Sequence, residues 1–295
     1  MTMHKYIFLT SLLLAALASC AKWTEDEAIR PKIVHPWEVQ PAVWEQYAAS
    51  LYHYKSVPHY RCYARLDNAP DPARSEKHFL RELPDSLDLV ALTHADKLSD
   101  FDREDLARMK RIGTRVLYQL DYAVGIDPEK VLADIRESGL DGIALSAVAK
   151  LGDPAFLSGL SAAVRKFAAE KGKQGLLVYE GDPVALSAED RSLVDLFVLD
   201  TQALKSTFEI RQAVHSATLR LDIPAAKLLL AGDFGVTVLD ENLAEHPALE
   251  LLCEKIMTLG KLGGLAVCRI DEDYYHVDGN YTLVRSLIQK LNPSK

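Results

Sequence analysis

The sequence predicts a (β/α)8 barrel built as a single domain. Short apolar, strand-like runs alternate with longer amphipathic, helix-like runs along most of the chain. The apolar runs are hydrophobic at nearly every position, which is typical of parallel strands buried on both faces. The chain has 295 residues, of which 48% are hydrophobic, so it can build one large α/β core.

Eight strands are predicted, each followed by a helix or a short helical turn. The predicted strands are 59–66, 87–93, 114–120, 142–148, 175–179, 193–199, 227–231 and 264–270. The predicted helices are 75–82, 103–112, 128–138, 154–171, 188–192, 207–221, 248–262 and 282–291. Helical patterning also covers residues 38–54, ahead of the first strand.

Residues at the expected helix ends support these assignments. Asp127-Pro128 and Asp153-Pro154 are typical of an N-cap followed by proline in the first turn. Gly139 and Gly172 stand at helix ends, where a left-handed residue is favoured. The alternation also fits a doubly wound open sheet. The barrel is preferred because no Gly-x-Gly-x-x-Gly loop follows the first strand.

The N-terminus reads as a targeting segment. A basic Lys5 precedes an apolar run over residues 7–18, which is too short to span a membrane, so residues 1–19 are predicted to be a signal peptide. Its end, Leu17-Ala18-Ser19-Cys20, resembles the bacterial lipobox, which implies a lipidated Cys20. The alternative is an ordinary signal peptide with a chance cysteine. A tether is expected over residues 20–36 and the barrel domain over residues 37–295.

Acidic residues follow the predicted lipidation site. The segment Trp23-Thr24-Glu25-Asp26-Glu27, with Cys20 and Lys22, resembles the start of surface lipoproteins from bacterial glycan-uptake systems. The resemblance implies a lipid anchor in the outer membrane, display at the cell surface, and outer-membrane transporter proteins as partners. A merely solvated linker is the other interpretation.

Charge and cysteine content narrow the function classes. With 34 basic and 42 acidic residues the formal net charge is −8, which argues against a nucleic-acid partner. No CxxC or paired-histidine motif is present, so neither a metal site nor a cofactor is expected. Cys62 and Cys268 fall on the first and last strands, which are neighbours in a closed barrel. A disulfide between them is one option, and two small buried hydrophobic side chains are the preferred one.

Polar side chains gather at the predicted strand ends, where barrel enzymes carry their sites. Several have an ordinary structural explanation as helix caps, turn residues or mutual ion pairs. As a set, they are rich in hydrogen-bonding groups with aromatic residues nearby, which suits the hydroxyls and apolar ring faces of sugars. The candidate ligand-binding residues are Arg65, Asp67, Gln119, Asp121, Ser146, Tyr179, Glu180, Asp200, Gln202, Asp233, Arg269, Asp271 and Tyr274.

The fourth predicted strand carries the most specific motif. It reads Asp141-Gly142-Ile143-Ala144-Leu145-Ser146-Ala147-Val148 and resembles the glycoside hydrolase family 18 strand Asp-Gly-x-Asp-x-Asp-x-Glu. Ala144 and Ser146 stand at the two later aspartate positions, and Val148 stands at the position of the proton-donating glutamate. Gly263-Gly264-Leu265 and Asp271-Glu272-Asp273-Tyr274 also fit that family.

This resemblance implies a hydrolase-like barrel without its catalytic groups. In family 18 the N-acetyl group of the substrate attacks, a glutamate donates the proton, and aspartates orient the amide. Val148 has no proton to donate, and losing general-acid help costs about two to four orders of magnitude in rate. The first hypothesis is therefore a non-catalytic, cell-surface lipoprotein that captures N-acetylglucosamine- or mannose-containing glycans for uptake.

Two alternatives remain. One is an active endo-β-N-acetylglucosaminidase or related O-glycosyl hydrolase that uses displaced carboxylates such as Glu180 or Asp233. The other is a structural subunit of an outer-membrane uptake complex.

Overall fold

The computed structural model describes residues 36–68, 75–123, 126–148, 150–172 and 175–293. The predicted signal peptide, Cys20 and nearly all of the predicted tether lie outside these residues. The chain divides into two units, Met1–Glu45 and Gln46–Lys295. The described part of the first unit contains α2 (Pro36–Val39) and the start of α3 (Pro41–Ser56). Within it the rings of Trp37 and Trp44 lie 5.5 Å apart.

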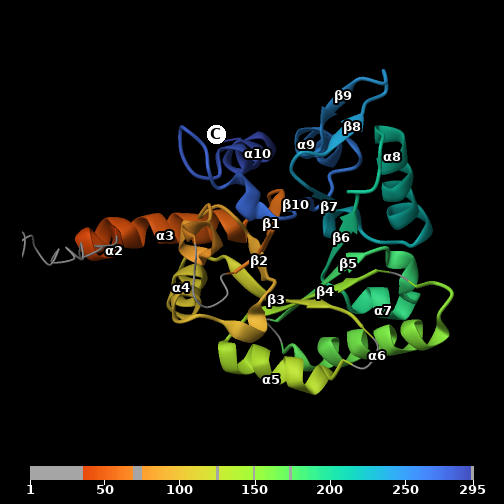
Figure 1. Cartoon of the computed structure of the whole chain (residues 1–295), viewed down its shortest axis with the longest axis horizontal. Helices are drawn as coiled ribbons and strands as arrows, with labels where there is room; N and C mark the ends of the chain where they lie inside the picture. Colours follow the sequence, from red (N-terminus) through yellow and green to blue (C-terminus); the bar gives the residue numbers. More distant parts are fainter. Residues whose placement is uncertain (1–35, 69–74, 124–125, 149, 173–174, 294–295) are drawn as a thin grey trace, which may run out of the picture. The chain divides into compact units, whose positions relative to one another are not determined.

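The second unit is a closed barrel of eight parallel strands (Figure 1), as the sequence predicted. The order around the barrel is β1-β10-β7-β6-β5-β4-β3-β2. The strands are β1 (Arg61–Leu66), β2 (Leu89–Leu92), β3 (Arg115–Asp121), β4 (Gly142–Ala147), β5 (Leu176–Gly181), β6 (Leu196–Asp200), β7 (Leu228–Gly232) and β10 (Gly264–Val267).

Helices follow most of the strands. They are α4 (Asp100–Arg111), α5 (Pro128–Ser138), α6 (Pro154–Glu170), α7 (Ala188–Leu193), α8 (Thr207–His215), α9 (Ala248–Thr258) and α10 (Thr282–Leu291). The predicted caps are confirmed: Asp127 accepts the amide of Glu129 and Asp153 accepts that of Ala155, both at 3.0 Å. Gly139 ends α5 in the left-handed region, at φ 70°.

Three local features differ from the prediction or were not predicted. The helix expected over residues 75–82 is two short 3-10 turns, η2 (Glu76–His78) and η3 (Leu80–Glu82). The helix expected over residues 207–221 changes at Ser216 into a π-helical segment, η6 (Ser216–Arg220). An unpredicted antiparallel hairpin of β8 (Thr237–Leu239) and β9 (Glu245–Pro247) follows β7. These strands are too short to give a periodic signal.

No helix in the described part of the chain combines the length and the apolar character needed to cross a membrane.

Alternate residues of the barrel strands point inward and fill the barrel core. The buried core cluster is Tyr63, Leu89, Ala91, Leu117, Ala144, Val178, Leu196, Val198, Leu229, Ala231, Ala266 and Cys268. Cys62 pairs in register with Leu265, one residue from Ala266, so its side chain lies on the outer face of the sheet. Cys62 and Cys268 thus lie on opposite faces. Both are free and buried, which confirms the preferred interpretation.

A repeated aspartate clamp joins neighbouring strands at the N-terminal face of the barrel. The residue directly before β2, β4 and β6 is an aspartate whose carboxylate accepts an amide at the start of the preceding strand. The clamps are Asp88 with the amide of Cys62 at 2.8 Å, Asp141 with that of Val116 at 2.9 Å, and Asp195 with that of Leu177 at 2.8 Å. Gly263 holds the equivalent place before β10, where an added Cβ would lie 2.6 Å from the carbonyl oxygen of Ala226.

Candidate functional site

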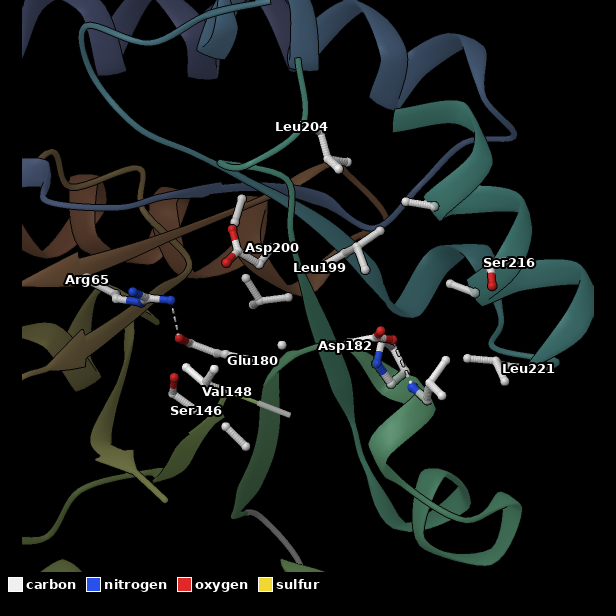
Figure 2. A pocket seen from close by; sticks show the side chains of 18 residues that line it. Arg65, Ser146, Val148, Glu180, Asp182, Leu199, Asp200, Leu204, Ser216 and Leu221 are labelled. Carbon is white, nitrogen blue, oxygen red and sulfur yellow. Dashed lines mark hydrogen bonds and ion pairs between the residues drawn. The ribbon is translucent and has the colours of Figure 1, made fainter. Parts of the chain in front are cut away.

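A cavity of about 400 Å³ opens at the C-terminal ends of β4, β5 and β6 and extends toward α8 (Figure 2). In (β/α)8 barrels this face carries the site, because the loops after the strands converge there. Five predicted positions line the cavity: Arg65, Ser146, Val148, Glu180 and Asp200. The unpredicted lining residues are Ala147, Gly181, Asp182, Pro183, Val184, Val198, Leu199, Leu204, Ala213, Ser216, Ala217, Leu221 and Ala231.

An ion pair crosses the mouth of the barrel. Arg65 on β1 and Glu180 on β5 belong to opposite strands, and Arg65 Nη2 lies 2.5 Å from Glu180 Oε2. Figure 2 shows the two side chains pointing toward one another. The Glu180 side chain is only 2% exposed, whereas that of Arg65 is 27% exposed. The pair therefore forms a floor on the barrel side of the cavity.

Two further side chains donate hydrogen bonds to Glu180. The hydroxyl of Tyr63 on β1 donates to Oε1, and the amide Nε2 of Gln119 on β3 donates to Oε2 at 3.3 Å. Both oxygens of Glu180 thus accept hydrogen bonds, and the donors belong to three residues. Both carboxylate oxygens are therefore occupied by protein donors and are not free to contact a substrate.

Burial fixes the protonation of the groups around Glu180. Burial raises the pKa of Tyr63 well above its ordinary value and the negative charge of Glu180 adds to this rise, so Tyr63 remains a neutral donor. Burial alone would lower the pKa of Arg65, but its ion pair with Glu180 outweighs this and the pKa is raised. Burial also raises the pKa of Cys268 to about 12, so this thiol in the barrel core is not a thiolate nucleophile.

The four positions that correspond to the acidic residues of the family 18 motif lie at three different depths in the barrel. Asp141 is at the N-terminal face, where it clamps Val116 and pairs with Arg115 at 3.2 Å. Ala144 is fully buried in the barrel core. Ser146 and Val148 reach the cavity, and Val148 is 83% exposed. Of these four positions, only Ser146 and Val148 therefore face the cavity.

Other carboxylates near the mouth are held by local contacts. Asp233 is paired with Arg269, whose Nη2 lies 2.7 Å from Asp233 Oδ2. Asp200 accepts both the main-chain amide of Gln202, at 3.0 Å, and its side-chain amide, at 3.1 Å. Asp182 accepts the amide of Val184 at 3.0 Å and caps a 3-10 turn, η5 (Pro183–Ala185). Asp182 and Asp200 are both exposed and line the cavity, so both carboxylates are open to a ligand there.

Several predicted residues lie away from the cavity. Tyr179 is fully buried, packs against Phe197 and donates to the carbonyl of Asp182 at 3.3 Å. It points outward because its neighbours Val178 and Glu180 both point inward. Asp121 is exposed at the end of β3, in register with Ser146, but does not line the cavity.

The remaining predicted residues belong to contacts between loops. Asp67 is bound by His94 at 2.9 Å. Asp271 is buried and pairs with Lys77 at 2.9 Å. The hydroxyl of Tyr274 lies 3.1 Å from Glu76 Oε2, within the same loop contact. Arg269 and Asp271 are not paired with each other, because each of these side chains has another partner.

The cavity wall differs in character from the predicted sugar site. Among the described residues that line it, none is aromatic. Its α8 side is formed by Leu204, Ala213, Ser216, Ala217 and Leu221, which the sequence did not single out. These small and aliphatic residues carry no chemical signature, since the same types form any helix–sheet contact. No cluster of three or more potential metal ligands occurs in the ranges that the structure describes.

Comparison with known proteins identifies the fold. No protein-family profile matches the sequence, and no curated protein matches it. Among solved structures, a glutamate-to-glutamine variant of BT1044 gives a TM-score of 0.72 at 19% identity, covering 88% of this chain and 96% of that one.

Two chitinases are also similar. A chitinase from Bacteroides thetaiotaomicron gives a TM-score of 0.61 at 12% identity, over 80% of this chain and 97% of that one. The GH18 chitinase ChiB from the chitin utilization locus of Flavobacterium johnsoniae gives a TM-score of 0.56 at 12% identity, covering 80% of this chain and 94% of that one. This protein therefore has the (β/α)8 barrel fold of glycoside hydrolase family 18 chitinase-like proteins.

Proposed function

We propose that this protein binds N-acetylglucosamine- or mannose-containing glycans at the barrel mouth without cleaving them. The observation that carries the proposal is Val148, which stands at the motif position of the proton-donating glutamate and is 83% exposed at the cavity. The site thus keeps its opening at this position while it lacks the acid. The fold shared with chitinases supports the choice of glycan.

The carboxylates that could replace the missing acid are poorly suited to the task. A general acid must hold a proton near neutral pH, usually because its surroundings disfavour the charged form. Glu180 is bound by Arg65, Tyr63 and Gln119, and Asp233 is bound by Arg269. Both carboxylates are thus already engaged by protein partners and are not free to contact a glycosidic oxygen. Binding is therefore the better-supported function, and hydrolysis at Glu180 or Asp233 is the alternative.

The test combines binding and cleavage on the full mature chain. Calorimetry with chitohexaose, a mannan oligosaccharide and an N-glycopeptide is expected to show saturable binding of one of them, with no oligosaccharide released on prolonged incubation. Asp200→Ala is expected to weaken that binding, while Asp100→Ala, at a fully exposed aspartate on α4, leaves it unchanged. Absence of binding to all three would overturn the proposal. Oligosaccharide release that Glu180→Gln abolishes would establish the hydrolase instead.

We further propose that the protein is lipid-anchored at Cys20 and displayed on the outer membrane, where it passes glycan to transporter proteins. This part of the proposal rests on the N-terminal sequence alone. Cys20→Ala is expected to move the protein from the membrane fraction to the soluble fraction. A variant that stays in the membrane fraction would contradict the lipid anchor but not the glycan site.

A further inference from the structure

The cavity has two chemically different ends. At the barrel mouth the lining is polar, with Arg65, Ser146, Glu180 and Asp200. Toward α8 it becomes mainly aliphatic, with Leu199, Leu204, Leu221, Val184, Ala213 and Ala217 beside the one carboxylate of Asp182. Figure 2 shows Arg65, Ser146 and Glu180 grouped at one end, and Leu221 with Ser216 at the other. A ligand that fills this space needs a polar part and an aliphatic part.

Small side chains create the space at the aliphatic end. In α8, Ile210 and Val214 are almost fully buried and fill their positions. Ala213 in α8, with Ser216 and Ala217 directly after it, lines the cavity, and these small residues leave room that larger side chains would occupy. Protein interiors are normally close-packed, so an aliphatic space of this kind is uncommon. An aliphatic wall of this kind gains free energy when an apolar group covers it.

The helix geometry changes at the same place. The amide of Leu221 donates to the carbonyl of Ser216 at 3.1 Å, which is the π-helical pattern. Short π-helical segments occur frequently at functional sites. Here Ser216, Ala217 and Leu221, which lie in or directly after the segment, all line the cavity.

The residue types in the lining determine which interactions can hold a sugar. None of the cavity-lining residues that the structure describes is aromatic, so stacking of a sugar ring on them does not provide the affinity there. The volume of about 400 Å³ is in the range of small-molecule sites, which combine a largely apolar wall with a few polar groups. A sugar with an aliphatic substituent matches both ends.

We propose that the cavity binds an N-acylated amino sugar whose acyl chain is longer than acetyl, with the sugar at Ser146 and Asp200 and the chain between β5, β6 and α8. This inference rests on the proposed glycan-binding function and names the substituent that the site selects. The polar end supplies hydrogen-bond donors and acceptors for the hydroxyls and the amide. The aliphatic end buries the chain.

The test compares glucosamine derivatives that differ only in chain length: N-acetyl, N-butanoyl and N-hexanoyl. Calorimetry on the full mature chain is expected to show affinity rising by at most roughly fourfold for each added methylene group, from the transfer free energy of a buried methylene. Ala217→Leu fills the aliphatic end, so it is expected to remove most of that rise while changing N-acetyl binding less than twofold. Leu219→Ala is the matched control, because Leu219 lies in the same segment but is 77% exposed.

The outcomes separate this inference from the proposed function. Equal affinity for all three chain lengths would overturn the inference and leave glycan binding intact. No affinity for any derivative, together with none for chitohexaose, mannan oligosaccharide or N-glycopeptide, would overturn both. If Ala217→Leu does not fold, Ala213→Leu fills the same end from a more exposed position. A rise with chain length that survives in a folded filling variant would also contradict the inference.

Discussion

Arg65 and Glu180 sit on opposite strands of the barrel, yet their side chains meet over its axis, with Arg65 Nη2 2.5 Å from Glu180 Oε2. This contact separates the barrel core below from the cavity beside it. It also engages Glu180, a buried carboxylate of the mouth that a displaced mechanism could use. The same ion pair therefore bears on stability and on function.

Glu180→Gln is expected to lower the free energy of unfolding by about 2–4 kcal/mol. The substitution leaves Arg65 with a largely buried charge and no counter-charge, a change that typically costs about 3–5 kcal/mol, reduced here because Arg65 is partly exposed. Urea unfolding measures it. The double variant Arg65→Met with Glu180→Gln should recover part of the loss, and a double variant less stable than Glu180→Gln alone would refute the explanation.

Asp141→Ala is expected to cost about 1–3 kcal/mol of stability and to leave glycan affinity unchanged. The carboxylate satisfies the buried amide of Val116 at the N-terminal face, so its removal leaves that amide without its partner. Asp88→Ala and Asp195→Ala should behave alike, since they remove equivalent clamps. Thermal unfolding measures the loss of stability, and calorimetry measures the glycan affinity. A loss of glycan binding in folded Asp141→Ala would place this residue in the site after all.

Lys55 is expected to make stability rise with pH in the alkaline range. Burial lowers its pKa to about 8, and its Nζ donates only to the uncharged Asp85 carbonyl and Thr114 hydroxyl, each at 2.6 Å. Between pH 8 and 10.5 the unfolded chain binds this proton more tightly than the folded chain does. The contribution of Lys55 to stability therefore increases with pH across that window. The total change in the Lys55 contribution across this window is at most about 3 kcal/mol.

The pH dependence is measured as the difference in unfolding free energy between wild type and Lys55→Met from pH 7 to 10.5. The unfolding free energy of the wild type should increase relative to that of the variant as pH rises. Lys110→Met, at an exposed lysine, is the control and should run parallel to wild type. A difference that stays constant with pH would show that Lys55 keeps an ordinary pKa.

Restoring the motif is expected to fail at Ala144 and to be tolerated at Val148. Ala144→Asp buries a carboxylate in the apolar barrel core, where it has no cationic partner, so it should destabilise the protein by more than about 3 kcal/mol. Val148→Glu changes an exposed side chain and should stay within about 0.5 kcal/mol of wild type. Melting temperatures test the contrast. Equal melting temperatures would mean that the core can accommodate the acid.

The barrel was predictable because its information is periodic. Buried apolar runs, caps such as Asp153 and terminators such as Gly139 all agree on the alternation of strand and helix. The short hairpin and the π-helical segment were not predictable, since three-residue strands and one inserted helical residue leave no periodic trace.

Strand parity decides which of the predicted strand-end residues reach the site. Glu180 points into the barrel mouth and Tyr179 points out of it, although the two are adjacent in sequence. Asp271 and Tyr274 looked equivalent to other strand-end residues, but long-range contacts with residues 76–82 bury them. Ala213 and Ala217 matter through the space they leave, and an absence of side-chain volume is not visible in a sequence.

The clamps at the N-terminal face divide the barrel into four successive strand pairs of unequal strength. In three pairs an aspartate side chain ties the second strand to the first, but before β10 Gly263 offers only its main chain, whose amide reaches the carbonyl of Leu228 at 2.8 Å. The β7–β10 pair is therefore the one in which local opening costs least, and its amides should exchange with solvent hydrogen before those of β3 and β4. The insertion that forms the β8–β9 hairpin falls in this same pair. The last quarter of the barrel thus combines the weakest side-chain clamping with an additional hairpin between its two strands.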